Sequence, residues 1–348
     1  MWARIFLGAG ILSAALALSA CEIGYYGHLL HGQYGLVADR EPIDKVLDDP
    51  KADPELQRHL RIVQAARRYA SGTLALPDNG SYTGYTDLHR RYVVWNVFAA
   101  PEFSLKPHEW CFLMVGCLGY RGYFDEARAR EQADALKGEG EDVYVAGIAA
   151  YSTLGWFDDP VLNTMLAWPD DMLAGTIFHE LGHQQLYVKG DTAFNESFAT
   201  FVEEQGLRQY LPAAPDTDKV WQRRAREREF VTLMLAARQR LDAVYRAGGA
   251  PDALRAAKAQ EFARLRADYE TLKAGWGGDA RYDAWFKQPL NNARLLPFGL
   301  YYQWVPAFAA LFAEAKGDWK AFYAAAKKVG ELDPPKREQR LRELMVPS

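Results

Sequence analysis

Apolar residues occur at helical spacing in some stretches of this chain and in short continuous runs in others. In the N-terminal half, apolar positions three or four apart predict a helix over residues 43–70. Runs of β-branched and aromatic residues predict strands at 92–98, 110–115 and 143–148, and a second helix is predicted over 124–136. These elements predict a mixed sheet in this half of the chain.

The C-terminal half is predicted to be mostly helical. Residues 219–273 are rich in Arg, Ala, Glu and Leu and are broken only at 248–251, which predicts a long antiparallel helical hairpin. A further helix over 291–315 is expected to be kinked or interrupted at Pro297 and Pro306. The charged C-terminal tail is also expected to be helical.

One more helix, predicted to begin after residues 169–171 and to end near Gly190, joins the two halves. The fold class is therefore α+β, with a mixed sheet in the N-terminal half, a helix that carries the candidate active site, and a mostly helical C-terminal half. No repeat or low-complexity linker divides the chain. We expect a single domain over 21–348, made of an N-terminal part (21–175) and a helical part (176–348).

The chain has 348 residues, of which 49% are hydrophobic and 25% charged, and its formal net charge is −4. This composition suits one large domain or two intimate ones. There is no basic tract and no Lys/Arg patch interleaved with aromatic residues, so nucleic acid is not an expected partner. After residue 20, no segment approaches the ~20 uninterrupted apolar residues that a membrane-spanning helix needs.

The first twenty residues have the pattern of a secretory signal. Arg4 precedes an apolar run over 5–17, and small residues lie just before Cys21. The Leu-Ser-Ala-Cys sequence that ends at Cys21 resembles the bacterial lipoprotein signal. The resemblance implies removal of 1–20, acylation of Cys21, and a domain anchored to a membrane surface of the bacterial cell envelope, on its periplasmic or extracytoplasmic side. An ordinary signal peptide and an uncleaved anchor are the alternatives.

Only two cysteines, Cys111 and Cys117, follow Cys21. In an oxidising compartment such a pair can form a disulfide. If both lie on one helix, however, their Cα atoms would be about 9 Å apart, which is too far for a disulfide. Two buried free thiols are therefore at least as good an interpretation. A metal role is disfavoured because no His or second Cys pair accompanies them.

The most informative motif is His179-Glu180-x-x-His183. On a helix, positions i and i+4 share one face, so His179 and His183 can present two imidazoles to one ion. Glu180 is rotated about 100° from that line, close enough to polarise a water held by the ion. Two imidazoles, a carboxylate and an open position are typical of a hydrolytic zinc site.

This motif also occurs by chance, as two histidines on a helix with an exposed Glu between them. The chain has only seven histidines, and two of them lie here at ligand spacing with apolar neighbours. Gly182 lies inside the predicted helix, where a glycine lowers the stability of the helix by about 1 kcal/mol relative to alanine. Such a cost is often tolerated where another backbone approaches closely. These observations favour a genuine metal site.

Zinc needs a third protein ligand, and Glu196, Glu203 and Glu204 are the downstream candidates. Glu196 is expected to open a second helix, and Glu203 lies seven positions later on the same face. Residues 195–199, Asn-Glu-Ser-Phe-Ala, resemble the N-E-x-x-A motif of the gluzincin metallopeptidases, whose third ligand is that Glu. The resemblance implies Glu196 as the ligand, with Glu203 as a partner of an imidazole. Glu203 is the alternative ligand, because the spacer in the larger gluzincins is longer by about six or seven residues.

Several further stretches resemble the bacterial lipoproteins catalogued as "predicted aminopeptidases", over nearly the whole mature chain. They are residues 79–85, 94–101, 116–124, 150–157 and 291–293, together with Tyr301. The resemblance implies a zincin-like peptidase fold.

Four residues are candidates on the substrate side of the site. Tyr301 could stabilise the developing oxyanion, as a Tyr or His from the C-terminal region often does in gluzincins, and an aromatic core stripe explains it equally well. Arg121 could bind a substrate carboxylate, or form a structural salt bridge. Tyr151 lies at the end of a strand expected to pair with an extended peptide. Asn292 belongs to the stretches that carry the resemblance.

The sequence thus favours a zinc-dependent metallopeptidase, an aminopeptidase by resemblance, with a peptide as its substrate. Zn²⁺ would be bound by His179, His183 and Glu196, and Glu180 would act as general base. A binding lipoprotein that keeps the fold without catalysis is a competing hypothesis, against which the intact Glu180 argues. A zinc hydrolase of a non-peptide amide, such as one in cell-wall material, fits the sequence as well.

Overall fold

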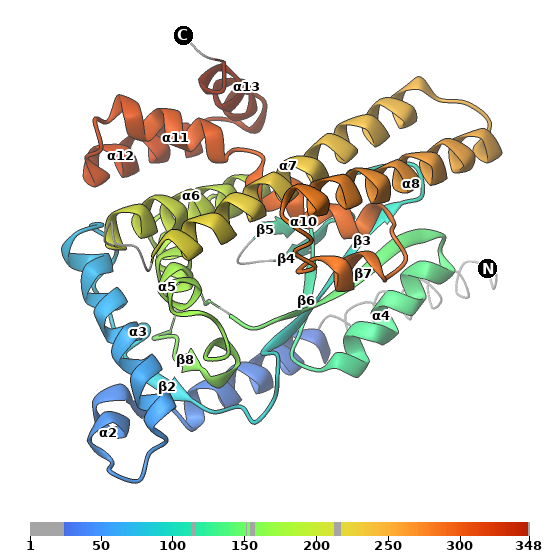
Figure 1. Ribbon diagram of the computed structural model, residues 1–348. Helices are drawn as coiled ribbons and strands as arrows, with labels where there is room; N and C mark the ends of the chain where they lie inside the picture. Colours follow the sequence, from blue (N-terminus) through green and yellow to red (C-terminus); the bar gives the residue numbers. More distant parts are fainter. Residues whose placement is uncertain (1–23, 113–115, 151, 154–156, 212–216, 347–348) are drawn as a thin grey trace, which may run out of the picture.

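The computed structural model describes residues 24–112, 116–150, 152–153, 157–211 and 217–346 of the chain. Within these residues the fold is α+β, and the C-terminal half is helical, as predicted (Figure 1). The N-terminal half contains a helix over 24–38, β1 (Glu41–Pro42), α2 (Ile43–Asp48), α3 (Pro54–Gly72), β2 (Gly84–Thr86), β3 (Val94–Pro101), β4 (Trp110–Phe112), β5 (Gly116–Leu118), β6 (Arg121–Tyr123), α4 (Glu126–Gly138), β7 (Glu141–Ile148) and β8 (Val161–Leu162). The helices that follow the short 3₁₀ turn Asn163–Met165 are α5 (Asp170–Gln185), α6 (Thr192–Tyr210), α7 (Asp218–Ala247), α8 (Pro251–Gly275), α9 (Asp283–Phe286), α10 (Asn292–Tyr302), α11 (Val305–Glu314), α12 (Trp319–Gly330) and α13 (Pro334–Leu344).

The strands form three small sheets rather than the single mixed sheet that the sequence predicted. In the described residues their orders are β1-β2-β8, β6-β3-β7 and β4-β5, and only the first is mixed, because β8 runs parallel to β2. Only β3 and β7 are long, and they pair antiparallel from Val94 opposite Ile148 to Pro101 opposite Glu141. The other strands are two or three residues long, too short to extend one continuous sheet.

The β6-β3-β7 sheet is buried on both faces, which explains the continuous apolar run in β3. Val97 and Ala99 point to one face and pack with Ala129 and Ala133 of α4. Phe98 and Ala100 point to the other face, where they pack with Ala293, Leu296 and Leu300 of α10. Successive side chains on a strand alternate between faces, so a strand covered twice needs apolar residues at every position.

The helix predicted over 43–70 is two helices, α2 and α3. Two prolines, Pro50 and Pro54, interrupt it, and the residue before a proline disfavours helical backbone angles. Pro54 occupies the first turn of α3, and the Asp53 side chain caps that helix by accepting from the backbone N–H of Glu55.

Cys111 and Cys117 form a disulfide, so the free-thiol interpretation is wrong. The two cysteines lie directly opposite each other in the β4–β5 hairpin, with Cα atoms 3.8 Å apart. They do not share a helix, and the distance argument against a bridge therefore does not apply.

The candidate metal helix, α5, packs between α3 and α6 in the largest apolar cluster among the described residues. Ile177, Phe178 and Leu181 of α5 are fully buried, as is Phe198 of α6. A Cβ at Gly182 would lie 3.4 Å from the Cα of Ala199, so the glycine allows α5 and α6 to approach closely. This contact holds the two helices of the candidate site together.

The helix predicted over 291–315 is divided into α10 and α11. Pro297 lies within α10, and the break falls just before Pro306, which lies in the first turn of α11. By length and composition Asn292–Glu314 could cross a membrane, a property it shares with the core helices of soluble proteins. Half of the most apolar 18-residue stretch of this segment is buried inside the protein. The side chains of Leu295 and Phe308 are fully buried.

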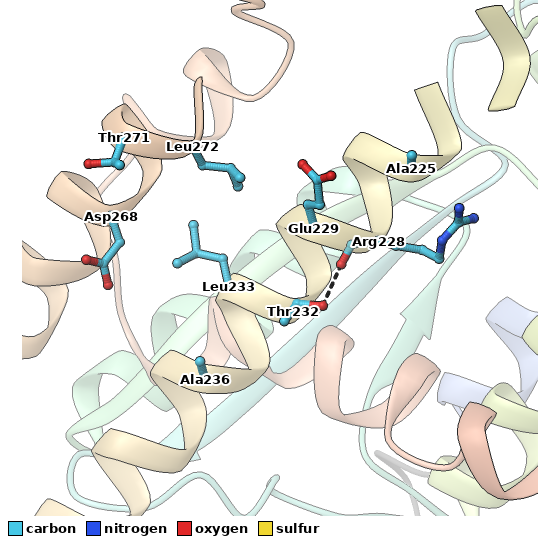
Figure 2. A pocket seen from close by; sticks show the side chains of 9 residues that line it. All are labelled: Ala225, Arg228, Glu229, Thr232, Leu233, Ala236, Asp268, Thr271 and Leu272. Carbon is cyan, nitrogen blue, oxygen red and sulfur yellow. Dashed lines mark hydrogen bonds between the residues drawn. The ribbon is translucent and has the colours of Figure 1, made fainter. Parts of the chain in front are cut away.

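Helices α7 and α8 form the predicted hairpin and project from the molecule (Figure 1). An open groove of about 610 Å³ runs between them, with Leu233 and Leu272 at its base (Figure 2). Glu229, Arg228 and Asp268 add charge to its lining. None of its lining residues belongs to the candidate metal site.

Candidate metal centre

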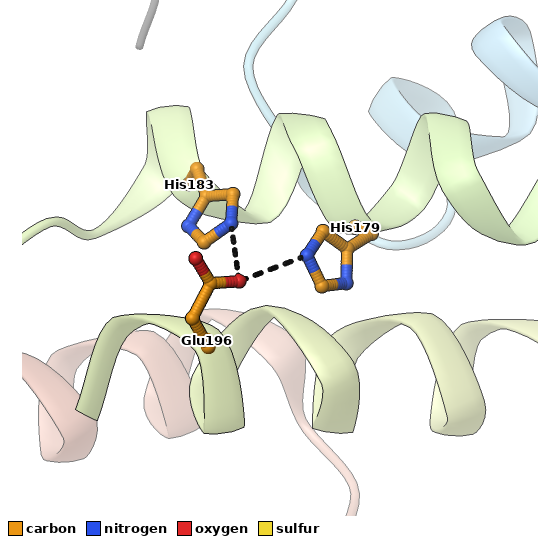
Figure 3. A group of neighbouring side chains, drawn as sticks. All are labelled: His179, His183 and Glu196. Atoms are coloured by element: carbon orange, nitrogen blue, oxygen red, sulfur yellow. Dashed lines mark ion pairs between the residues drawn. The ribbon is translucent and has the colours of Figure 1, made fainter. Parts of the chain in front are cut away.

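Three side chains from α5 and α6 converge on one point (Figure 3). Nε2 of His179 is 3.5 Å from Oε2 of Glu196, and Nε2 of His183 is 3.4 Å from the same oxygen. The three ligand atoms all lie within 4.8 Å of one another. His183 and Glu196 are buried, so the cluster is shielded from bulk water.

The spacing of these atoms fits a metal ion. Ligand atoms about 2.0–2.1 Å from a tetrahedral zinc are about 3.3–3.4 Å from one another. The two imidazole-to-carboxylate distances match that separation. Two imidazoles and a carboxylate are a donor set that zinc accepts, although other divalent ions accept it as well. His179, His183 and Glu196 could therefore hold a metal ion.

The second ring nitrogens of the two histidines have different surroundings. Nδ1 of His179 lies 3.4 Å from Oε2 of Glu203, which leaves Nε2 free for a metal. Nδ1 of His183 is buried and has no hydrogen-bond partner among the described residues. Glu203 thus contacts the far side of an imidazole, and Glu196 lies between the two imidazoles.

Electrostatics in the cluster favour opposite charges on its members. Burial alone would lower the pKa of His179, but hydrogen bonds to Glu196 and Glu203 raise it above its usual range. Burial would also raise the pKa of Glu196, but the His183 and His179 imidazoles lower it. Without metal the cluster therefore retains a proton on an imidazole. A metal ion has to displace that proton, which makes binding weaker in acid.

Glu180 lies beside the cluster without being part of it. Its side chain is half-buried. Burial raises the pKa of its carboxyl, whereas the charges of His179 and His183 lower it. A carboxyl group with a raised pKa next to two imidazoles is suited to accept and return a proton.

Two tyrosines contact the ligands. The Tyr120 hydroxyl donates to Oε1 of Glu196 at 3.4 Å. The Tyr301 ring stacks on the His179 ring, with centroids 6.2 Å apart and planes 19° from parallel. Burial raises the pKa of both hydroxyls, so both stay protonated and can donate.

Sequence reasoning named Arg121 in this segment and missed Tyr120. Adjacent residues that enter a strand point to opposite faces. The Arg121 guanidinium lies 4.0 Å from the centroid of the Tyr25 ring. Tyr25 packs with the residues that face α4, so Arg121 lies on that face of the sheet. The sequence could have shown this, because adjacent side chains at the start of a strand alternate between its two faces. Only one of Tyr120 and Arg121 can therefore point toward the ligands.

The other two candidates on the substrate side are placed differently. Asn292 is fully buried, and its side chain donates to three backbone oxygens at the end of β3 and in the loop after it, and accepts from the Tyr245 hydroxyl. Those contacts give it a structural role. Tyr151 lies outside the described residues, and β7 ends before it, at Ile148.

The loop over 79–85 also touches the metal helix. Gln184, next to His183, accepts from the Asn79 side chain and donates to the Ser81 hydroxyl. Tyr82 is buried with φ of 60°, a conformation that costs energy for a non-glycine residue. Of the segments singled out by resemblance, 79–85 thus contacts the metal helix, and 116–124 contacts Glu196 through Tyr120.

Fold and site together define a class of protein: an α+β chain in which H-E-x-x-H on one helix and a Glu on the next could hold a metal ion. The sequence model of a family described as "Putative aminopeptidase" matches residues 24–341, and the chain belongs to that family. Membership indicates a peptidase, that is, a hydrolase. Comparisons with curated proteins and with solved structures find no match.

Proposed function

We propose that this protein is a zinc-dependent metallopeptidase with a zincin-like fold that removes residues from the N-terminus of peptides. The observation that carries the proposal is the convergence of His179, His183 and Glu196 beside the half-buried carboxyl of Glu180. Family membership supports the peptidase class. A site that only stabilised the fold would not need an additional carboxyl beside its ligands.

In this proposal His179, His183 and Glu196 hold the ion, and Glu203 orients His179. A zinc ion held there would supply Lewis-acid chemistry, the polarisation of a water and of a carbonyl oxygen. Glu180 takes the proton from the attacking water and passes it to the departing amine. The Tyr301 hydroxyl, protonated because of its burial, donates to the oxygen on which negative charge develops.

The location proposed with this function is the bacterial cell envelope. The pattern of residues 1–20 and the cysteine that follows support a lipid anchor at Cys21. Cys21 itself lies outside the described residues. A membrane surface, reached through that anchor, and a peptide substrate are the proposed partners.

The test uses soluble protein that starts at Glu22, loaded with zinc, and pairs of peptides with free and N-acetylated termini. An aminopeptidase cleaves only the free-amine member of each pair. Cleavage of both members would contradict the aminopeptidase proposal. Bound zinc without turnover of any peptide would contradict the peptidase proposal and favour a binding protein or a hydrolase of non-peptide amides.

A further inference from the structure

A chain of charged side chains extends from the ring nitrogen of His179 that does not contact Glu196. Oε2 of Glu203 lies 3.4 Å from Nδ1 of His179. Its Oε1 accepts from the Arg224 guanidinium at 3.2 Å. Nε of Arg224 lies 3.5 Å from Oδ2 of Asp171, in the first turn of α5. The chain therefore starts and ends on the metal helix and passes through α6 and α7.

These charges are largely withdrawn from solvent. The side chains of Arg224 and Asp171 are 8% and 3% exposed, and that of Glu203 is 23% exposed. Burial would lower the pKa of Arg224, but the neighbouring carboxylates raise it, so the guanidinium stays charged. Buried charges are held in place by their partners, because losing one partner leaves the other uncompensated.

We propose that Arg224 is a positioning residue for the metal centre. It binds one oxygen of Glu203, which leaves the other oxygen to accept from Nδ1 of His179. That contact fixes the tautomer and the ring orientation in which Nε2 of His179 presents its lone pair to a metal. The proposal rests on the proposed metal site, because the orientation of this ring matters to function only if Nε2 is a ligand.

Arginine is suited to this position for a geometric reason. One guanidinium donates a hydrogen bond to Glu203 through a terminal nitrogen, and its Nε, held in the same rigid plane, forms an ion pair with Asp171 without a hydrogen bond. A lysine ammonium at the same position would keep the charge but could not hold both carboxylates in these directions. Arg224→Lys therefore separates geometry from charge.

The neighbouring Arg223 is a matched control. It forms an ion pair with the same carboxylate of Asp171, and its side chain is 28% exposed. Among the described residues, its ion pair is with Asp171 and not with Glu203. Arg223→Gln removes the other arginine that binds Asp171 and leaves the contacts of Arg224 with Glu203 and of Glu203 with His179 in place.

The experiment measures zinc affinity by competition with a chelator, for wild type, Arg224→Gln, Arg224→Lys and Arg223→Gln. Thermal unfolding of the metal-free proteins shows which variants fold. We expect Arg224→Gln to bind zinc about 10–100-fold more weakly, the range typical for outer-shell partners. Arg224→Lys should lie between it and wild type, and Arg223→Gln should match wild type. The visible spectrum of the cobalt-substituted protein should change in the Arg224 variants only.

The outcomes separate this inference from the proposed function. If wild type binds no zinc, the proposed function fails, and this inference fails with it. If wild type binds zinc and a folded Arg224→Gln binds it equally well, the positioning role alone is overturned. If Arg224→Gln does not fold, Arg224→Lys decides, because wild-type zinc affinity and an unchanged cobalt spectrum in that variant would overturn the proposal.

Discussion

The Tyr120 hydroxyl donates to Oε1 of Glu196 at 3.4 Å, while Oε2 of the same carboxylate points to the two imidazoles. Each oxygen of the proposed metal ligand thus has its own partner. Tyr120 comes from the turn between β5 and β6, just beyond the disulfide-closed hairpin. A side chain of the N-terminal half therefore limits how the α6 carboxylate can rotate.

Tyr120→Phe should weaken metal binding without abolishing it. A hydrogen bond of this length to a charged acceptor contributes about 1 kcal/mol, which corresponds to roughly fivefold in affinity. Chelator competition measures the effect. Tyr123→Phe is the control, because its hydroxyl bonds to Gln132 rather than to a ligand. Equal affinities for both variants would show that Tyr120 does not restrain Glu196.

Glu196→Gln and Glu203→Gln should differ strongly in zinc content. Loss of a ligand removes a charged donor, whereas loss of an outer-shell partner typically costs about 10–100-fold. We therefore expect Glu196→Gln to be isolated nearly free of zinc and Glu203→Gln to remain partly loaded. Metal analysis after identical purification measures both, with Glu204→Gln as control. The reverse order would make Glu203 the third ligand.

Glu180→Gln should keep zinc and fold but lose hydrolysis. The substitution preserves the shape of the side chain and removes its capacity to accept a proton. General-base loss typically costs about 10²–10⁴-fold in rate. The measurement pairs kcat on a cleaved peptide with zinc content of the same preparation. Full activity in a zinc-loaded variant would remove Glu180 from the mechanism.

Cys21→Ser should prevent lipidation. In wild type, mass spectrometry of the membrane fraction should find a mature N-terminus at Cys21 that carries acyl chains, because the sequence before it has the lipoprotein pattern. The variant should stay unprocessed or be released from the membrane. A native chain that still begins at Met1 would refute the anchor.

The metal motif could be predicted from sequence because its geometry is local. His179 and His183 are one helical turn apart, so a helix alone brings their imidazoles to one face. The contact of Glu196 with both imidazoles required only that a second helix pack against the helix that carries them. Gly182 indicated such packing, because a glycine lets two helices approach closely. Tyr120 and Arg224 were not predicted, since their contacts with Glu196 and Glu203 span 76 and 21 positions.

The division of the sheet was not predicted, and the choice between a disulfide and free thiols stayed open, for a related reason. Short strands such as β4 and β5 carry too few residues to show which neighbours they pair with. The separation of Cys111 and Cys117 is compatible with one helix or with a hairpin, and only the antiparallel register places them opposite each other. Helices were predicted better, because their apolar period repeats over many residues.

Asp159 should make the folded protein less stable as pH rises from about 4 to 6. Burial raises the pKa of its carboxyl from 3.8 to about 6, although hydrogen bonds from Thr153 act in the opposite direction. Its side chain is 1% exposed, and Oδ1 has no hydrogen-bond partner among the described residues. Between these two pKa values the folded state holds a proton that the unfolded state has released. Raising the pH through this window therefore favours unfolding.

Asp159→Asn should remove that part of the pH dependence. A shift of two pKa units corresponds to about 3 kcal/mol. The free energy of unfolding of Asp159→Asn, measured relative to that of wild type, should therefore rise by up to about 3 kcal/mol as the pH is raised from 4 to 7. Denaturant unfolding at several pH values measures the difference between the two proteins, which cancels the contributions of other groups. The exposed neighbour Asp158, changed to Asn, is the control. A difference between wild type and Asp159→Asn that stays constant across this range would show that folding does not raise the pKa of Asp159.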